Sequence, residues 1–285
     1  MTIEITQLHG LDAVRVGTVD GAGAVVTCYG AHVVSWVADG EERLFLSELS
    51  AMDRRAPIRG GVPVIFPQFA TYGALPHHGL VRTRDWVLGD RGIDGGAAYA
   101  TFAIEDSDET RQVWPHAFRC ELTVGVSELQ LQLRLRVDNP GPAPFSFCAA
   151  LHTYLRVDDI RSARLEGLQG TRYRDRTDAD RELVETASSL IVGSEVDRVY
   201  MQAPRSLRVL EAARGMRIDA DGFPDVVVWN PWVARSKLLP DLADDAYLNM
   251  LCVEAAAVVQ PLTLAPGESW RGSQTLTCVG QPIHR

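Results

Sequence analysis

Two titratable residues, His152 and Glu254, interrupt apolar runs that are typical of β-strands. His152 lies in ALHTYLRV and Glu254 lies in MLCVEAAAV. Burial of either group is unfavourable unless a partner or a ligand compensates for the lost hydration. One lone histidine in such a run is usually a core residue whose hydrogen bonds are satisfied, but two such groups beside a basic segment favour a pocket.

The two residue types also indicate what chemistry such a pocket could perform. An imidazolium can give a proton and a carboxylate can take one. Near neutral pH this pair needs little pKa adjustment, so it indicates proton exchange between two oxygens.

The basic segment runs from Arg54 to Arg84 in a chain that is acidic as a whole. The chain has 28 Lys and Arg against 37 Asp and Glu, a net charge of −9, yet this segment holds five arginines and no acid. Its charge must be balanced by carboxylates from elsewhere in the fold or by an external anion, and the sequence leaves both open. For Arg54, Arg55 and Arg84, solvated side chains with distant ion-pair partners are the better interpretation.

Arg59 and Arg82 differ because glycines stand near them, in IRGGVP and HHGLVR. A missing side chain lets a ligand or another chain segment approach the backbone. A guanidinium group can hold phosphate oxygens through two parallel charge-assisted hydrogen bonds. The two arginines therefore suit a small phosphorylated substrate.

Several other kinds of catalytic site are disfavoured. The chain lacks both the GxxxxGK[ST] pattern of a P-loop and the GxSxG nucleophile elbow. His77 and His78 are adjacent, and adjacent side chains of an extended segment point in opposite directions, so we expect no metal site there. Asp197 and Glu254 could supply the two carboxylates of a glycosidase, which leaves hydrolysis open.

The segments that carry these residues have the sequence patterns of β-strands. In LQLQLRLRV, residues 129–137, aliphatic and polar side chains alternate with a period of two, which is typical of a half-buried antiparallel strand. Shorter β-rich runs recur along the chain between Gly, Asp, Asn and Pro. Helical periodicity is weak, and the best candidate, LLPDLADDAY, is interrupted by Pro240 and reads as a turn or a single helical turn. We therefore expect an all-β protein with large antiparallel sheets packed as a sandwich or an open barrel.

Length and composition indicate the number of domains, the cellular compartment and the kinds of partner. Its 285 residues can form one folded unit, so we expect a single domain over residues 1–285. The five cysteines show no CxxC pair, and neither an export signal nor a membrane-spanning segment is found, which predicts a cytoplasmic protein. The acidic balance argues against nucleic acid as a partner. We expect a monomer that contacts neither nucleic acid nor membrane.

Six groups of motifs carry a resemblance to a known family. They are IRGGVPVIFPQF, LPHHGLVRTRDW, LHTYLRVDDI, VDRVY, VVVWNPW, and CVEAA followed by PLTLAPGESW. In this order they resemble the glucose-6-phosphate 1-epimerases, or hexose-6-phosphate mutarotases, of the aldose 1-epimerase superfamily, from about Arg59 to Trp270. The resemblance implies a galactose-mutarotase-like β-sandwich with the sugar in an open cleft. It also implies an isomerase that interconverts the α and β anomers of an aldohexose 6-phosphate, above all glucose 6-phosphate.

The resemblance implies catalytic roles for the pair described first. His152 of LHTY would be the general acid that protonates the ring oxygen, and Glu254 of CVEAA would be the base that removes the anomeric hydroxyl proton. The ring opens, rotation about the C1 to C2 bond exposes the other face of the aldehyde, and reversal of both transfers closes the opposite anomer. This chemistry needs no metal, nucleotide or other cofactor.

The resemblance also implies which residues bind the substrate. His78 would contact the sugar near its ring oxygen, and Asp197 would accept hydrogen bonds from its hydroxyls. Arg59 and Arg82 would hold the 6-phosphate, with Gln68 nearby. The positive charge of the basic segment would then serve to bind a phosphate dianion, which the net negative charge of the rest of the molecule repels.

The chain departs from the commoner forms of the family motifs at three places. Gln68 stands where an aromatic residue often follows the proline, HGLVR replaces HGFAR, and CVEAA replaces CVETA. Two alternatives stay open: a mutarotase for unphosphorylated aldoses, in which Arg59 and Arg82 form structural ion pairs, and a sugar-phosphate-binding module without turnover. We expect Lys237 to be a solvated side chain and Trp229 to pack in the core, although either could line the cleft.

Overall fold

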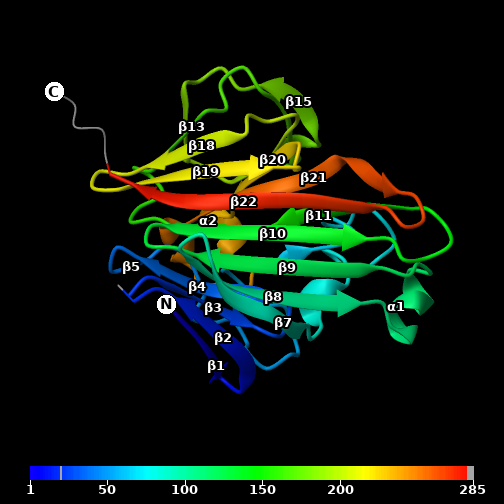
Figure 1. Cartoon of the computed structure of the whole chain (residues 1–285). Helices are drawn as coiled ribbons and strands as arrows, with labels where there is room; N and C mark the ends of the chain where they lie inside the picture. The colour runs from blue at the N-terminus through cyan, green and yellow to red at the C-terminus, as the bar shows by residue number, and fades with distance from the viewer. Residues whose placement is uncertain (20, 281–285) are drawn as a thin grey trace.

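The computed structural model describes residues 1–19 and 21–280, and antiparallel strands dominate it (Figure 1). The first sheet has the order β1 (Thr2–Leu8), β2 (Leu11–Gly17), β3 (Gly23–Thr27), β4 (His32–Ala38), β5 (Glu41–Glu42). The nine-stranded sheet has the order β16 (Ser189–Ile191), β13 (Arg164–Glu166), β18 (Ser206–Leu210), β19 (Gly215–Asp221), β22 (Ser269–Val279), β10 (Gln130–Asp138), β9 (Arg119–Val126), β8 (Ala97–Glu105), β7 (Val87–Asp94).

The eight-stranded sheet carries the residues that the sequence singled out. Its order is β15 (Arg181–Val184), β14 (Arg172–Asp175), β17 (Val196–Tyr200), β20 (Asp225–Asn230), β21 (Met250–Leu264), β11 (Phe145–Leu151), β6 (Val64–Ile65), and β12 (Tyr154–Arg156) pairs with β21. The helical segments are short: α1 (Asp108–Val113), α2 (Trp232–Ser236), and the 3-10 turns η1 (Val81–Thr83), η2 (Arg176–Asp178) and η3 (Ala246–Asn249). The all-β prediction is confirmed, and the stretch LLPDLADDAY is a turn that ends in the start of η3.

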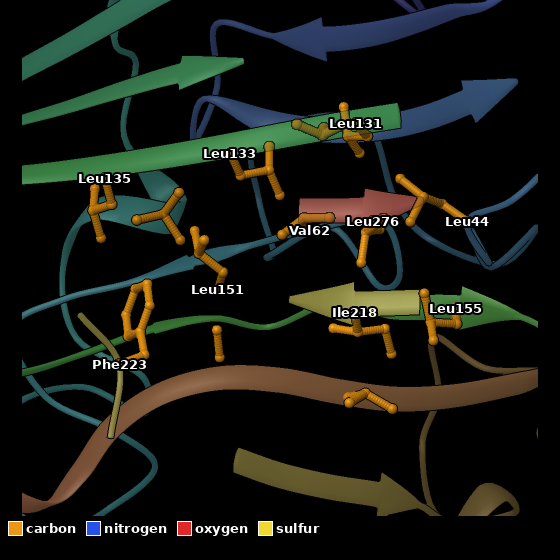
Figure 2. Packing of buried hydrophobic residues seen from close by; sticks show 14 of the residues in the cluster. Leu44, Val62, Leu131, Leu133, Leu135, Leu151, Leu155, Ile218, Phe223 and Leu276 are labelled. Carbon is orange, nitrogen blue, oxygen red and sulfur yellow. The ribbon is translucent and has the colours of Figure 1, made fainter. Parts of the chain in front are cut away.

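Strand β10 confirms the clearest prediction from the sequence. Its side chains Leu131, Leu133 and Leu135 are buried, and the strand pairs with β9 on one side and β22 on the other. Figure 2 shows Leu133 and Leu135 near Val62, in the segment before β6, and near Leu151 of β11. The largest hydrophobic cluster thus lies between the two large sheets, where burial of each leucine favours folding by about 2 kcal/mol.

The strands at the centre of the eight-stranded sheet are buried on both faces, which explains their continuous apolar sequences. Along β21, Val253 and Ala255 join the largest hydrophobic cluster, whereas Cys252 and Ala256 belong to smaller clusters. Because successive side chains of a strand point to opposite faces, Glu254 shares the face of Cys252 and Ala256. The carboxylate therefore points away from the main core.

The second glycine of IRGGVP, Gly61, supports the chain that carries His152. Its φ is +60°, and a Cβ added there would lie 2.1 Å from the carbonyl oxygen of Val33. The Gly61 carbonyl accepts a hydrogen bond from the amide of Tyr154 (2.9 Å), and the Pro63 carbonyl accepts one from the amide of His152 (3.0 Å). A neighbouring chain segment, and not a ligand, occupies the space beside this glycine.

Replacing Gly61 by Ala is expected to lower the free energy of unfolding by more than about 4 kcal/mol, because the new Cβ meets backbone and the positive φ is strained. Urea unfolding followed by tryptophan fluorescence measures the loss. Gly96→Ala is the matched control: its φ is +83°, but nothing lies within 4 Å of an added Cβ. That variant should lose only about 1 to 2 kcal/mol. Equal losses in both variants would contradict the steric role of Gly61.

Candidate active site

A cavity of about 320 Å³ lies on the face of the eight-stranded sheet that Glu254 shares. A volume of this size suits a small molecule. Five of the residues predicted from the sequence line it: Arg59, His78, His152, Asp197 and Glu254. Gln68 and Arg82 are not among the lining residues. Side chains from the loops before and after β6, from the link between β11 and β12, from β17 and from β21 thus meet at one site.

The strand register brings His152 beside Glu254. Strand β12 pairs with β21 so that Tyr154 lies opposite Cys252. His152, two residues before Tyr154, therefore lies opposite Glu254, two residues after Cys252. His152 Nε2 is 3.4 Å from Glu254 Oε1, and the two side chains are 9% and 1% exposed. Within residues 1–19 and 21–280, His152 Nδ1 and Glu254 Oε2 have no hydrogen-bond partner.

Burial shifts the pKa values of this pair in opposite directions. It raises the pKa of Glu254 well above its usual value, and the charge of Asp197 adds to the rise. It lowers the pKa of His152 well below its usual value, and the charges of Arg59 and Arg82 lower it further. Both groups therefore favour their uncharged forms, with the proton on the carboxyl. The expectation that the pair needs little pKa adjustment is wrong, because either charged form loses its hydration when buried.

His77 and His78 both line the cavity although they are neighbours in the sequence. The φ of His78 is +64°, so the chain turns and the two ring centroids lie 4.0 Å apart. The expectation that these side chains point in opposite directions is therefore wrong. The amide of Ala70 donates to His78 Nδ1 (3.2 Å), which leaves the ring proton on Nε2. His78 is thus a neutral donor whose ring centroid lies 5.4 Å from that of His152.

The histidines of the site do not form a metal-binding constellation. In the part of the chain that the structure describes, no group of three or more His, Cys, Asp and Glu residues is arranged to hold a metal ion.

Asp197 on β17 supplies a second carboxylate to the cavity. Its Oδ1 lies 3.5 Å from Arg176 Nη1. Burial raises the pKa of Asp197 to about 6, although the charge of Arg176 acts to lower it. At neutral pH this carboxylate is ionised and can accept hydrogen bonds from hydroxyl groups.

The raised pKa of Asp197 predicts a pH-dependent stability. The folded protein binds this proton more tightly than the unfolded chain, so the stabilisation is complete below about pH 4 and is lost as the pH rises through about 6. Between these values wild type should lose stability relative to Asp197→Asn, by at most about 3 kcal/mol. Urea unfolding of both proteins from about pH 4 to 7 measures the difference. A difference that stays constant with pH would contradict this account.

Arg59 reaches the cavity with three of its N–H groups already in use. Nε and Nη2 each lie 3.1 Å from Asp241 Oδ2, and Nη1 donates to the Tyr154 hydroxyl at 3.1 Å. Burial acts to lower the pKa of Arg59, but Tyr154 and Asp241 raise it above its ordinary value. Two of the five guanidinium N–H groups therefore remain for a ligand.

Arg82 does not line the cavity but contacts His77, which does. Its Nη2 donates to the carbonyl oxygen of His77 (2.8 Å). Burial lowers the pKa of Arg82 to about 10, and the nearby charge of Arg59 also acts to lower it. Among the described residues no carboxylate forms an ion pair with Arg82. Two half-buried guanidinium groups thus stand near one another, and of the two only Arg59 pairs with a carboxylate, that of Asp241, among the described residues.

The remaining arginines of the basic segment behave as expected. Each forms an ion pair with a carboxylate: Arg54 with Asp85, Arg55 with Asp53, and Arg84 with Glu109. The prediction that they are ordinary surface side chains is confirmed.

Gln68 supports a loop and does not face the cavity. Its side-chain nitrogen donates to the carbonyl oxygens of Ala70 (3.1 Å) and Leu75 (2.9 Å), and its Oε1 accepts from the Leu75 amide (2.9 Å). These bonds use the amide to close the loop that leads to His78. The substrate contact predicted for Gln68 finds no support in this geometry, because the side chain is buried and occupied by backbone groups.

A buried amide connects the two large sheets beneath the His152–Glu254 pair. The Thr153 hydroxyl donates to Gln274 Oε1, and Gln274 Nε2 donates to the Val253 carbonyl oxygen (3.1 Å). Thr153 directly follows His152, and Val253 directly precedes Glu254. Gln274 itself belongs to β22 of the nine-stranded sheet. One side chain therefore ties together the positions next to both members of the pair.

Comparison with known proteins identifies the family. The family model described as Aldose 1-epimerase matches residues 12–277. The chain belongs to the aldose 1-epimerase family. A relative from Cenchrus ciliaris, named "Putative glucose-6-phosphate 1-epimerase", is 38% identical over 95% of this chain and 85% of its own length. A protein of the same name from Escherichia coli (strain K12) is 35% identical over 80% of this chain and 77% of its own length.

Solved structures similar to this aldose 1-epimerase confirm the fold. The crystal structure of a "putative mutarotase (YeaD)" from Salmonella typhimurium superimposes with a TM-score of 0.90 at 29% identity, covering 98% of this chain and 94% of that one. Galactose 1-epimerase from Lactobacillus acidophilus NCFM has a TM-score of 0.73 at 13% identity, covering 99% of each chain, and shows the fold alone. The predicted galactose-mutarotase-like sandwich is confirmed. The chain is an epimerase, an isomerase that acts on a small sugar molecule.

The sequence did not point to several residues that line the cavity of the epimerase. Arg176 in η2 and Arg235 in α2 lie outside every motif. Only the folded structure shows that they line the cavity. His77 also lines the cavity, and the sequence gives it no role beyond the disfavoured one of a metal ligand. Trp229 lines the cavity, and period-two alternation with the core residue Val228 could have indicated this. Lys237, the other undecided residue, is exposed and does not line the cavity.

Proposed function

We propose that this epimerase interconverts the α and β anomers of an aldohexose 6-phosphate, above all glucose 6-phosphate. One observation carries the proposal: a single cavity is lined by the His152–Glu254 pair and by Arg59, with the charge of Arg82 nearby. The names of the Cenchrus ciliaris and Escherichia coli relatives support a phosphorylated substrate. Two half-buried guanidinium groups with one carboxylate partner leave a positive charge, which favours an anionic ligand such as a phosphate group.

Proton transfer within the pair explains how the resting site becomes active. At rest the proton is on Glu254 and His152 is neutral. A phosphate dianion beside Arg59 and Arg82 offsets the charges that lower the pKa of His152, so the proton moves across the 3.4 Å gap to the imidazole. Glu254 is then a carboxylate and His152 an imidazolium, which are the base and the acid that the reaction needs.

Ring opening then proceeds with one proton taken and one given. Glu254 removes the proton from the anomeric hydroxyl while His152 protonates the ring oxygen, which breaks the C1 to O5 bond and forms the aldehyde. The pair returns to its neutral resting form at this stage, when the open chain can rotate about the C1 to C2 bond. Reversal of both transfers closes the other anomer.

The remaining polar groups of the cavity orient the sugar. His78 Nε2–H donates to the sugar near its ring oxygen, and the Asp197 carboxylate accepts from sugar hydroxyls. Gln68 acts indirectly by closing the loop before His78. Because the phosphate group is far from C1, its binding energy orients the substrate without touching the reacting bonds.

Saturation-transfer NMR of equilibrated sugars tests the proposal. The purified protein should raise the exchange rate between anomers of glucose 6-phosphate with a kcat/KM at least about a hundredfold above that for glucose. Equal rates for both sugars would favour the alternative of an epimerase for unphosphorylated aldoses, in which Arg59 only pairs with Asp241. Binding of the phosphate without exchange would favour a binding module.

We also propose that the protein is a cytoplasmic monomer whose residues 1–285 form a single domain and contact neither nucleic acid nor membrane. Residues 20 and 281–285 of this range lie outside the described residues. The five cysteines are all free, which supports a reducing compartment. Among the described residues, no helix is long and apolar enough to cross a membrane. Sedimentation of the purified protein tests the oligomeric state.

A further inference from the structure

Tyr154 lies between the acid end and the anion end of the cavity. Its ring is stacked on that of His152, with centroids 4.7 Å apart and planes within 9° of parallel. Its hydroxyl accepts a hydrogen bond from Arg59 Nη1 at 3.1 Å. The residue is 2% exposed, so both contacts are shielded from water. A single side chain therefore contacts a candidate catalytic group and a candidate phosphate ligand.

The stack has a special importance because the His152 ring is otherwise weakly held. A catalytic imidazole is usually oriented by a hydrogen bond to its second nitrogen. In the described part of the chain, His152 Nδ1 has no such partner, and Nε2 faces Glu254. The plane of the ring therefore depends on its aromatic neighbours. Tyr154 covers its face, and Trp229 approaches both rings at nearly right angles, at 6.4 Å from His152 and 6.1 Å from Tyr154.

Tyr154 is itself fixed by its backbone. Its amide donates to the Gly61 carbonyl (2.9 Å), and its carbonyl accepts from the Phe45 amide (3.0 Å). It also pairs with Cys252 across β21. With the main chain held on both sides, the ring can adjust only through its own torsions, and the Arg59 hydrogen bond restrains these. Any movement of the Arg59 guanidinium toward an anion therefore acts on the ring that supports His152.

We propose that Tyr154 is a positioning residue that holds the His152 imidazole in plane and couples its orientation to anion binding at Arg59. The coupling rests on the proposed function, since it assumes that the phosphate of the substrate binds at Arg59. Its consequence is that a phosphorylated sugar adjusts the orientation of the acid through Arg59 and Tyr154, whereas with an unphosphorylated sugar the imidazole keeps the resting orientation of the stack. Tyr154 would then contribute to substrate preference without touching the substrate.

Three variants separate the two contacts. Tyr154→Phe keeps the stack and removes the hydroxyl, whereas Tyr154→Leu removes both. Tyr200→Phe is the matched control, because Tyr200 is fully buried and its hydroxyl contacts Arg198 and Glu185 away from the cavity. Its kinetics should stay within about twofold of wild type for both sugars.

Kinetics give the first readout. For glucose 6-phosphate, Tyr154→Phe should lower kcat about tenfold with KM within about threefold, and for glucose it should change the rate less than about twofold. Tyr154→Leu should lower the rate more than about a hundredfold with both sugars. Equal losses for the two sugars in Tyr154→Phe would overturn the coupling and leave Tyr154 as packing.

Inorganic phosphate gives a second readout that does not depend on turnover. The imidazole nitrogen signals of His152, assigned by their absence in His152→Gln, are followed by NMR during a phosphate titration. Wild type should show a shift that saturates, and Tyr154→Phe should bind phosphate within about threefold of the same affinity but show less than about a third of the shift. An undiminished shift would overturn the proposal. If wild type proved not to prefer the phosphorylated sugar, the proposed function would fail while this titration still decided the coupling.

Discussion

Replacing Glu254 by Gln is expected to slow anomer exchange of glucose 6-phosphate by about a thousandfold, because positioned acid or base groups contribute factors of this order. The amide has nearly the shape of the carboxyl group but can neither take the anomeric proton nor share one with His152. Binding of the sugar phosphate should stay within about threefold, since Arg59 and Arg82 are untouched. Saturation-transfer NMR measures the exchange, and calorimetric titration measures the binding.

Glu185→Gln is the matched control for this prediction. Glu185 is also a buried glutamate, but its carboxylate contacts Arg198 and Tyr200 and does not line the cavity. Its loss should lower stability without changing the exchange rate per folded molecule by more than about twofold. Exchange by Glu254→Gln above about a tenth of the wild-type rate would contradict the assignment of Glu254 as the base.

Replacing Arg59 by Ala is expected to reduce the preference for glucose 6-phosphate over glucose by about ten- to a hundredfold, the worth of a charge-assisted contact to a phosphate. The preference is measured as the ratio of the two kcat/KM values. Glucose itself should be affected less than about threefold. Asp241 loses its cationic partner in this variant, so its stability is measured in parallel and rates are compared per folded molecule.

Arg55→Ala separates a specific loss from a general loss of positive charge. Arg55 belongs to the same basic segment, but its side chain is 88% exposed and pairs with Asp53. The sugar preference of this control should equal that of wild type. An unchanged preference in Arg59→Ala would indicate that Arg59 serves only Asp241 and Tyr154, and it would support the alternative of an unphosphorylated substrate.

Local periodicity was enough to predict strand β10. The alternation from Leu131 to Val137 depends only on which neighbours along the chain are apolar, so it is readable without knowledge of the partners β9 and β22. The apolar runs around His152 and Glu254 indicated that the two side chains share a pocket, and the resemblance to the epimerases supplied their expected roles. Spacing could not show that they touch, because they lie far apart in the sequence and only the register of β12 on β21 makes them neighbours.

Other features of the site depend on contacts that no local pattern encodes. Both histidines of HH line the cavity because His78 adopts a positive φ, whereas an extended chain would separate them. Arg176 reaches Asp197 through the η2 turn, which has no motif. The direction of the pKa shifts at Glu254 and His152 follows first from burial, and burial of a single group is decided by the whole packing around it.

The bridge formed by Gln274 has a consequence for how substrate range can change in this family. Thr153 and Val253 are both hydrogen-bonded to Gln274 on a strand of the opposite sheet. The neighbouring residues His152 and Glu254 are therefore held in place by the same side chain inside the sandwich. Other residues that line the cavity lie outside the strands: Arg59 and His78 on loops, Arg176 on the 3-10 turn η2 and Arg235 on the short helix α2. Exchanging these segments between relatives should therefore change which aldose the enzyme accepts. The arrangement of His152 and Glu254 should stay the same.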